Sequence, residues 1–133
     1  MTNTTAVILA AGLGKRTKFP LPKMLLPLAG KPLVSHITDR VLATFDVPPV
    51  IVSQASYHNQ LAALYPQVKV VTQPEANGTA DALLCAIPEV ATENILVLLG
   101  DCPLVSTELL SQMQSSAALI KMVSFKTENP TGY

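Results

Sequence analysis

The sequence predicts an α/β domain in which helices cover both faces of a mainly parallel sheet, giving three α/β/α layers. Short apolar runs rich in β-branched residues alternate along the chain with segments of helical periodicity. Their order, strand then helix then strand, is the pattern of parallel strands joined by crossover helices. A length of 133 residues is enough for one domain of this class with a real core.

Four apolar runs are expected to form strands that are buried on both faces of the sheet. They span residues 5–10, 49–53, 68–72 and 94–99. A last apolar segment, residues 117–125, is interpreted as a further strand.

Helical patterns occupy the intervals between these runs. The apolar residues of the segment 32–45 recur on one helical face, and Pro32 suits the first turn of a helix. Shorter helices are expected at residues 57–64, 79–90 and 107–115. Ser106 is the expected N-cap of the last one.

The connection from residue 11 to residue 31 breaks this pattern, because it contains no convincing element. Loops between a strand and a helix usually take about 2 to 6 residues. This one starts at the carboxyl end of a strand, where open α/β sheets bind their ligands. Since long ordered loops in compact domains are frequently functional, we expect a ligand site here.

Positive charge is concentrated in the same part of the chain. The first 38 residues carry a formal charge of +5 and the remainder −5, so that the whole chain is neutral. The basic residues concerned are Lys15, Arg16, Lys18, Lys23 and Lys31. A neutral chain has no general attraction to nucleic acid or to an anionic membrane, and neither is expected as a partner.

The composition of the chain also indicates the cellular compartment in which the protein is expected. Cys85 and Cys102 lie in apolar segments without metal-ligand spacing, which favours buried free thiols. No apolar stretch approaches the ~18 residues that span a bilayer, and no secretory leader is recognised, so a soluble cytoplasmic protein is expected. With 49% hydrophobic and only 14% charged residues, some apolar surface is expected to meet another molecule, as in a homo-oligomer.

The basic stretch LAAGLGKRTKFPLPK fits neither standard phosphate-binding loop. A Walker A loop would need glycine and serine or threonine where Leu9 and Arg16 stand, and the GxGxxG fingerprint lacks its third glycine. Gly12 and Gly14 nevertheless allow backbone N–H groups to approach an anion closely. Together with the basic side chains they indicate a polyphosphate site, the alternative being an ordinary solvated loop.

Polar residues follow two later strands at the same edge of the sheet. Asp101 comes shortly after the run 94–99, where a carboxylate would hold Mg²⁺ against phosphate oxygens, the alternative being a turn-capping residue. Gln73 follows the third run, and its amide complements the polar edge of uracil, the alternative being an exposed surface residue. Gly78 and Thr79 open the next helix, where a base or ribose can lie against backbone.

Four motifs together resemble the nucleotide-sugar pyrophosphorylases, a family of nucleotidyltransferases. They are VILAAGLGKRTKFPLPKMLLPLAGKPLVSH, QPEANGTADAL, LVLLGDCPL and NPTGY. Their order and spacing resemble the members that make UDP-N-acetylglucosamine. The resemblance implies a Rossmann-like fold of the nucleotide-diphospho-sugar transferase type. Residues 1–133 would be the nucleotide-binding part of a pyrophosphorylase domain, truncated before its sugar-binding part.

The resemblance implies a role for each matching residue. Arg16 and Lys23 would be catalytic, because they would neutralise the triphosphate. The nucleotide would contact Leu9, Ala10, Ala11, Gly12, Gly14, Lys23, Gln73, Gly78 and Thr79. Asp101 would bind Mg²⁺, and Gly132 would contact the sugar.

The implied reaction transfers UMP from UTP to a sugar 1-phosphate, in particular N-acetylglucosamine 1-phosphate, and releases pyrophosphate. It needs no covalent nucleophile, and His36 and His58 are interpreted as structural or surface residues. Lys15 replaces the family's threonine beside the phosphates, and further sugar contacts of the family lie beyond Tyr133, so we expect little turnover from this chain alone. A transferase using CTP, GTP or dTTP and a non-catalytic nucleotide-binding module remain alternatives.

Overall fold

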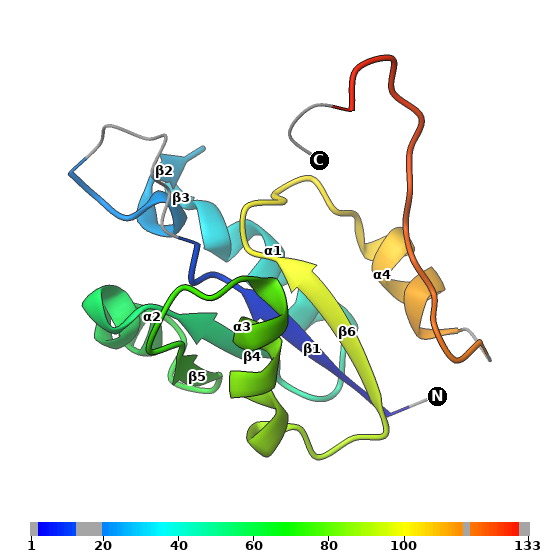
Figure 1. Cartoon of the computed structure of the whole chain (residues 1–133), viewed down its shortest axis with the longest axis horizontal. Coiled ribbons are helices and arrows are strands. Elements are labelled where there is room, and N and C mark those ends of the chain that lie inside the picture. The colour runs from blue at the N-terminus through cyan, green and yellow to red at the C-terminus, as the bar shows by residue number, and fades with distance from the viewer. Residues whose placement is uncertain (1–2, 13–19, 116–117, 131–133) are drawn as a thin grey trace.

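A four-stranded parallel sheet forms the centre of the molecule (Figure 1). The computed structural model describes residues 3–12, 20–115 and 118–130. The strands of the sheet are β1 (Thr4–Leu9), β4 (Val50–Ser53), β5 (Lys69–Thr72) and β6 (Asn94–Leu99). They lie in the order β5-β4-β1-β6, and every neighbouring pair is parallel. The four strands expected from the apolar runs are thereby confirmed, to within one residue at each end.

Helices cover both faces of this sheet. They are α1 (Leu33–Thr44), α2 (His58–Leu64), α3 (Thr79–Ala86) and α4 (Thr107–Gln114). On one face, Ile37 of α1 and Leu61 of α2 share a buried cluster with Ile8 of β1. On the other face, Ala82 of α3 packs in a second cluster with Val7. Because successive strand residues point to opposite faces, the expected three-layer α/β/α arrangement is confirmed.

Local signals place the helix ends close to the expected positions. Helix α1 begins at Leu33, one residue after Pro32, and the hydroxyl of Ser106 caps α4 by accepting a hydrogen bond from Leu109 N at 3.2 Å. Helix α3 is shorter than expected and continues as a single 3₁₀ turn, Ile87–Glu89. Pro88 lacks the N–H that an α-helix would use at that point, which accounts for the change.

The path of the chain across the sheet reverses at β1. From β1 it passes through α1 to β4 and through α2 to β5, and then returns through α3 to β6 on the other side of β1. The carboxyl ends of β1 and β6 therefore flank the point of reversal. Open α/β sheets form their ligand crevices at such points.

The connection between β1 and α1 contains more structure than expected. Its described part holds a 3₁₀ turn, Lys23–Leu25, and an antiparallel hairpin of β2 (Pro27–Leu28) and β3 (Lys31–Pro32). Ala29 and Gly30 form the hairpin loop with φ angles of 48° and 84°. Two-residue hairpin loops favour such positive φ angles, but Ala-Gly is a weaker signal than Asn-Gly, and the hairpin was missed for that reason.

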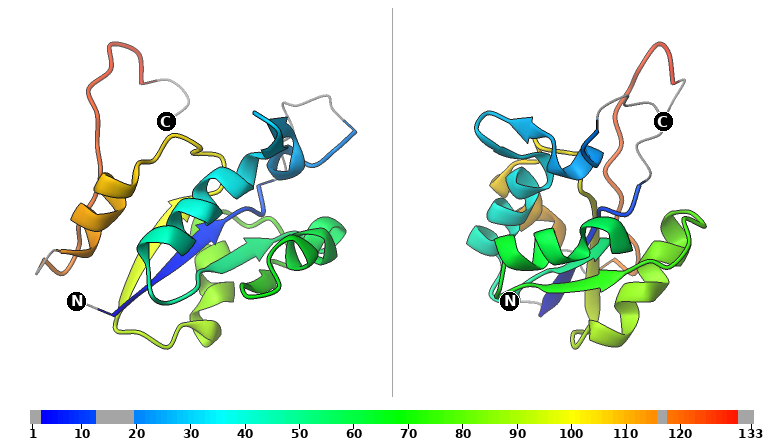
Figure 2. Two further views of the ribbon diagram at one scale, coloured as in Figure 1. Left: turned by 180° about the vertical axis from the view of Figure 1, so that it is seen from behind. Right: turned by 90° about the vertical axis from the view of Figure 1, so that its left-hand side faces the viewer.

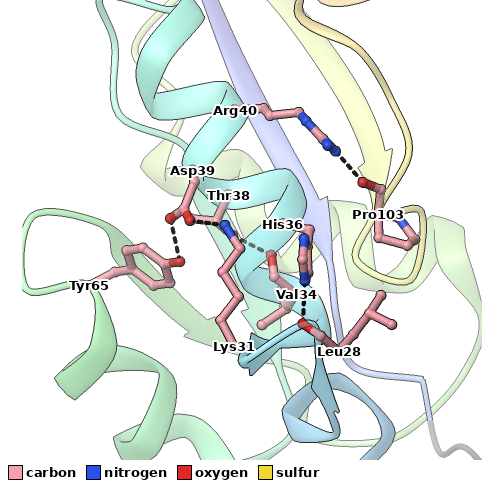
Figure 3. A network of polar contacts seen from close by, with 9 residues as sticks. All are labelled: Leu28, Lys31, Val34, His36, Thr38, Asp39, Arg40, Tyr65 and Pro103. Atoms are coloured by element: carbon pink, nitrogen blue, oxygen red, sulfur yellow. Dashed lines mark hydrogen bonds and ion pairs between the residues drawn. The ribbon is translucent and has the colours of Figure 1, made fainter.

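Helix α1 holds the hairpin in place through polar side chains (Figure 3). Lys31 of β3 pairs with Asp39, which also accepts a hydrogen bond from Tyr65 Oη at 2.6 Å. His36 Nε2 lies 2.8 Å from the carbonyl oxygen of Leu28. These contacts fix the chain that follows the 3₁₀ turn, and they confirm a structural role for His36.

Strand β6 differs from the expectation that it would be buried on both faces. It is an edge strand, and Ile95, Val97 and Leu99 are 38%, 43% and 47% exposed. Val97 is in register with the fully buried Val7, so these side chains lie on the face of the sheet that carries α3. Helix α3 packs over β1, β4 and β5 instead. The apolar pattern therefore identified the strand correctly but not what covers it.

The strand expected at residues 117–125 is not formed in its described part, residues 118–125. Leu119, Ile120 and Met122 are each more than four-fifths exposed. The segment runs outside α4, away from the sheet (Figures 1 and 2). A strand needs a neighbour to pair its backbone groups, and no described strand lies beside this one, so that the prediction was wrong.

The remaining expectations concern single side chains and the membrane. Cys85 and Cys102 are free, but they are half-buried rather than fully buried. His58 Nδ1 lies 2.9 Å from the hydroxyl of Thr72, a structural contact between α2 and β5. Among the described residues, no helix has the length and apolar character that crossing a membrane requires.

Candidate functional site

A cavity of about 330 Å³ opens at the carboxyl edge of the sheet, between the ends of β1 and β6 and the start of α3. Three stretches that are far apart in the sequence, together with one methionine, form its wall. The lining residues are Leu9, Ala11, Gly12, Met24, Gln73, Ala76, Gly78, Thr79, Ala82, Leu99 and Asp101. They meet because the carboxyl ends of parallel strands share one edge of a sheet.

The stretch after β1 presents backbone to the cavity. Side chains of the segment after β4 hold it in place: Tyr57 Oη donates to the carbonyl oxygen of Ala10, and Gln54 Nε2 donates to that of Ala11 at 2.8 Å. Burial raises the pKa of Tyr57 to about 12, so that its hydroxyl remains a donor at neutral pH. Gly12 has open space where a side chain would begin, which lets a ligand approach the backbone closely.

The stretch after β6 is packed tightly against the end of β1. Gly100 N donates to the carbonyl oxygen of Leu9 at 2.9 Å, and a Cβ on Gly100 would lie only 3.1 Å from that oxygen. The absence of a side chain thus allows the approach that carries Asp101 to the cavity. Arg40 of α1 donates to the carbonyl oxygen of Pro103, which anchors the loop two residues further on (Figure 3).

Lys23 forms an ion pair with Asp101, which lines the cavity. Lys23 Nζ lies 2.7 Å from Asp101 Oδ2, and both side chains are about one-third exposed. The two residues are 78 positions apart, and the sequence suggested a separate role for each. The neighbouring thiol of Cys102 stays neutral, because burial and then the charge of Asp101 raise its pKa.

The stretch after β5 contributes an amide and the start of a helix. Gln73 is only 6% exposed, and its Nε2 donates to Gly78 O at 3.2 Å and to Asp81 Oδ2 at 2.7 Å. Gly78, at the N-cap of α3, has a φ of 99°, a conformation that L side chains rarely adopt. Thr79 follows as the first residue of α3, which places an amide side chain beside a helix start.

Most of the residues that the sequence suggested for a site are gathered here. Those on the cavity wall are Leu9, Ala11, Gly12, Gln73, Gly78, Thr79 and Asp101. Ala10 is buried beneath the wall, and Lys23 reaches the site through its pair with Asp101. Gly14, Lys15, Arg16 and Gly132 lie outside the described residues.

Sequence reasoning missed three residues that support the wall. Gln54 holds the backbone at Ala11, Gly100 permits the close approach of β6, and Asp81 holds the amide of Gln73. The position of Asp81 in the first turn of α3 was a usable signal, because an acidic residue there lies near the preceding loop. The other two have no sequence signal, since their roles depend on strands that meet only in the fold.

The carboxylates near the cavity decide whether it could hold Mg²⁺. Among the described residues, no three His, Cys, Asp or Glu side chains cluster as a metal centre. Among the described residues that line the cavity, Asp101 is the one with a carboxylate. Its ion pair with Lys23 shows that a positively charged group can reach this carboxylate. Mg²⁺ is commonly bound by one or two carboxylates together with phosphate oxygens of a substrate. Asp101 therefore fits a Mg²⁺ that is bound jointly with a phosphate ligand.

Comparison with known proteins agrees with this geometry. The family described as MobA-like NTP transferase domain matches residues 6–129. The protein named bifunctional protein GlmU from Sorangium cellulosum is 36% identical over 99% of this chain. The match covers 31% of that relative, so the chain spans about a third of its length.

Solved structures share the fold. Rv0371c from Mycobacterium tuberculosis H37Rv is 29% identical with a TM-score of 0.68, covering 84% of this chain and 59% of the other. The inositol-1-phosphate CTP transferase from T. maritima has a TM-score of 0.67 at 22% identity, covering 75% and 44% respectively. The second likeness concerns the fold alone. Both agree with a Rossmann-like α/β/α architecture of the nucleotide-diphospho-sugar transferase type.

Proposed function

The chain belongs to the MobA-like NTP transferase domain family, and from this premise we propose that its cavity binds a nucleoside triphosphate, UTP in particular. The reaction would transfer UMP to a sugar 1-phosphate, with N-acetylglucosamine 1-phosphate as the preferred acceptor. The products would be a UDP-sugar and pyrophosphate. The resemblance of the four sequence motifs and the likeness to bifunctional protein GlmU support UTP and this acceptor.

One observation carries the proposal: a carboxylate that is paired with a cation, a glycine with open space around it and an oriented amide meet at one cavity. Asp101 lines the cavity and holds Lys23 in an ion pair, and Gln73 lines the cavity from the stretch after β5. A triphosphate needs positive charge and backbone N–H groups, while a base needs a polar group with a defined direction. Gly12, in the stretch after β1, also lines the cavity and leaves its backbone accessible.

The chemistry proposed for this site is an in-line displacement at phosphorus. An oxygen of the sugar phosphate would form a bond to the α-phosphorus of UTP, and the bond from that phosphorus to the pyrophosphate oxygen would break. Lys23 would exchange Asp101 for phosphate oxygens, and Arg16 would add a second positive charge to the leaving group. Asp101 would then hold Mg²⁺, which supplies charge neutralisation on the phosphate oxygens when bound. The rate would come from position and electrostatics.

Calorimetric titration with UTP, CTP, GTP and dTTP, each with and without Mg²⁺, tests the binding step. Preference for UTP supports the proposal, whereas preference for CTP, GTP or dTTP replaces UTP with that nucleotide. A folded protein that binds none of the four contradicts it. Formation of pyrophosphate from UTP and N-acetylglucosamine 1-phosphate separates a transferase from a module that only binds nucleotide.

A further inference from the structure

The side chain of Gln73 is held in one orientation by the residues around it. Its Nε2 donates to Asp81 Oδ2 at 2.7 Å and to the carbonyl oxygen of Gly78 at 3.2 Å. A carboxylate and a backbone carbonyl can only accept hydrogen bonds, so both require the N–H₂ end of the amide. The reverse orientation would place the amide oxygen against two other oxygens. The assignment of oxygen and nitrogen in this amide thus follows from its partners.

This orientation determines what Gln73 can offer to a ligand. Both N–H donors of the amide are used within the protein, and Oε1 has no hydrogen-bond partner among the described residues. No side-chain oxygen or nitrogen in the described part is both buried and unpaired, so Oε1 keeps some exposed surface, and the cavity is the open space that Gln73 lines. The group available at this point of the wall is therefore a hydrogen-bond acceptor.

We propose that Asp81 is a positioning residue that sets the base preference of this site, an inference that rests on the proposed function. By holding the N–H₂ end of Gln73, it directs an acceptor at the base, which favours a pyrimidine whose ring nitrogen N3 carries a hydrogen. Uracil and thymine have that N–H group, whereas N3 of cytosine is itself an acceptor and would face Oε1 unfavourably. Asp81 does not line the cavity, so it acts on the nucleotide only through Gln73.

The backbone of Gly78 also helps to orient the amide of Gln73. Its φ of 99° turns the chain at the start of α3 so that its carbonyl oxygen reaches the amide of Gln73. Asp81 follows three residues later, within the first turn of the helix. The charge of Asp81 also suits a helix N-terminus, so a test has to separate helix stabilisation from control of the amide.

Two substitutions make that separation. Asp81→Leu has similar bulk and no acceptor, which frees the amide of Gln73 to rotate and present N–H to the cavity. Asp81→Asn keeps an acceptor oxygen for Gln73 while it loses the charge. Nucleotide affinities are measured by calorimetry with UTP and CTP for the wild-type chain and both variants, with thermal unfolding as the check that each is folded.

We expect the wild-type chain to prefer UTP and Asp81→Leu to reduce the UTP-to-CTP affinity ratio roughly three- to tenfold, the value of one hydrogen bond. Asp81→Asn is expected to keep most of the wild-type ratio, whereas loss of helix charge alone would affect both variants alike. Lys23→Ala is the control for contacts to phosphate: it is expected to weaken UTP and CTP equally and leave the ratio unchanged. An unchanged ratio in folded Asp81→Leu overturns the inference.

A second measurement needs no ligand. The side-chain amide signal of Gln73 in a ¹H–¹⁵N spectrum is expected to move toward the solvent-exposed position and exchange faster in Asp81→Leu, but not in Asp81→Asn. If Asp81→Leu leaves this signal unaffected, Asp81 does not orient Gln73. The inference then fails, whichever nucleotide the chain binds. A folded wild-type chain that binds no nucleotide overturns the proposed function, and the base preference with it, even where the amide signal behaves as expected.

Discussion

At the scale of single residues, the contact between Lys23 and Asp101 couples the two charges that a metal-bound triphosphate would require. Their atoms lie 2.7 Å apart, so each charge is neutralised by the other in the protein alone. A phosphate group would compete with Asp101 for Lys23, and a metal ion would compete with Lys23 for Asp101. Binding of the two ligands should therefore be cooperative, because each one releases the side chain that the other needs.

Lys23→Ala is expected to weaken binding of Mg²⁺-UTP by about 1.5 to 3 kcal/mol, the value of a hydrogen bond to a charged group. The dissociation constant is measured by calorimetric titration. Lys69→Ala is the matched control, since Lys69 pairs with Glu89 at 3.3 Å and does not line the cavity. Equal losses in the two variants would show that only the overall charge matters.

Asp101→Asn is expected to remove the gain in UTP affinity that Mg²⁺ provides, while UTP binding without metal stays the same or improves. The physical reason is that the substitution removes the carboxylate proposed for the metal and releases Lys23 for phosphate. Titrations with and without Mg²⁺ measure both effects. A metal-dependent gain that survives the substitution would exclude Asp101 as the metal ligand.

At the scale of elements, helix α1 positions both loops that carry charge to the cavity. Lys31 and Asp39 join it to the hairpin that follows Lys23, and Arg40 joins it to Pro103 in the loop after Asp101 (Figure 3). A helix is stiff compared with a loop, so contacts along one helix keep the two loops in a fixed position relative to each other. Substitutions on α1 should accordingly affect the cavity without any contact with a ligand.

The contribution of Asp39 to stability is expected to depend on pH. Partial burial acts to raise the pKa of its carboxyl group, but hydrogen bonds from Lys31 and Tyr65 and the charge of Lys31 outweigh it and hold the pKa below its ordinary value. The folded state thus binds this proton less readily than the unfolded state does. The contribution is present in full above about pH 4 and is lost as the pH falls through the folded-state pKa.

Asp39→Asn tests this linkage. Its free energy of unfolding, measured by urea denaturation, is expected to lie below that of the wild-type chain at about pH 7, with the difference shrinking at about pH 3 and below. Asp46→Asn serves as the control, because Asp46 follows the end of α1 and is not one of the residues that contact Asp39. A difference that stays constant with pH would mean that the Asp39 carboxylate has no preference for the folded state.

At the scale of the whole molecule, the sheet is well covered at its centre and poorly covered at β6. Val7 and Val97 are partners in adjacent strands, yet the first is fully buried and the second is 43% exposed. Segment 118–125 adds further exposed apolar side chains beyond α4. Part of the apolar excess that composition indicated therefore lies on β6 and on segment 118–125.

This asymmetry predicts unequal effects of the same substitution. Ile8→Ala, at a fully buried position, is expected to lower the free energy of unfolding by about 2 to 5 kcal/mol, and Ile95→Ala, 38% exposed in β6, by about 1 kcal/mol or less. Urea denaturation measures both. Similar losses would show that β6 is covered in solution, and a dependence of the Ile95→Ala loss on protein concentration would identify a second copy as the cover.

Local patterns in the sequence predicted the four strands of the sheet, the helices α1 to α4 and their order, but not the hairpin of β2 and β3. Alternating periodicity identified the four strands and the helices between them, and that order placed the loops after β1, β5 and β6 at one edge. Asp101, Gln73 and Gly12 were predictable because each follows or adjoins a strand end. These predictions needed only the near neighbours of each residue in the chain.

Only the tertiary structure decided which of these residues touch and which surfaces are covered. The pair of Lys23 with Asp101, the approach of Gly100 to Leu9 and the exposure of β6 all depend on segments far apart in the sequence. The orientation of Gln73 belongs with them, since it required the turn at Gly78 to bring an acceptor within reach. Burial and ion pairing are properties of pairs of surfaces, and a local pattern describes only one surface of each pair.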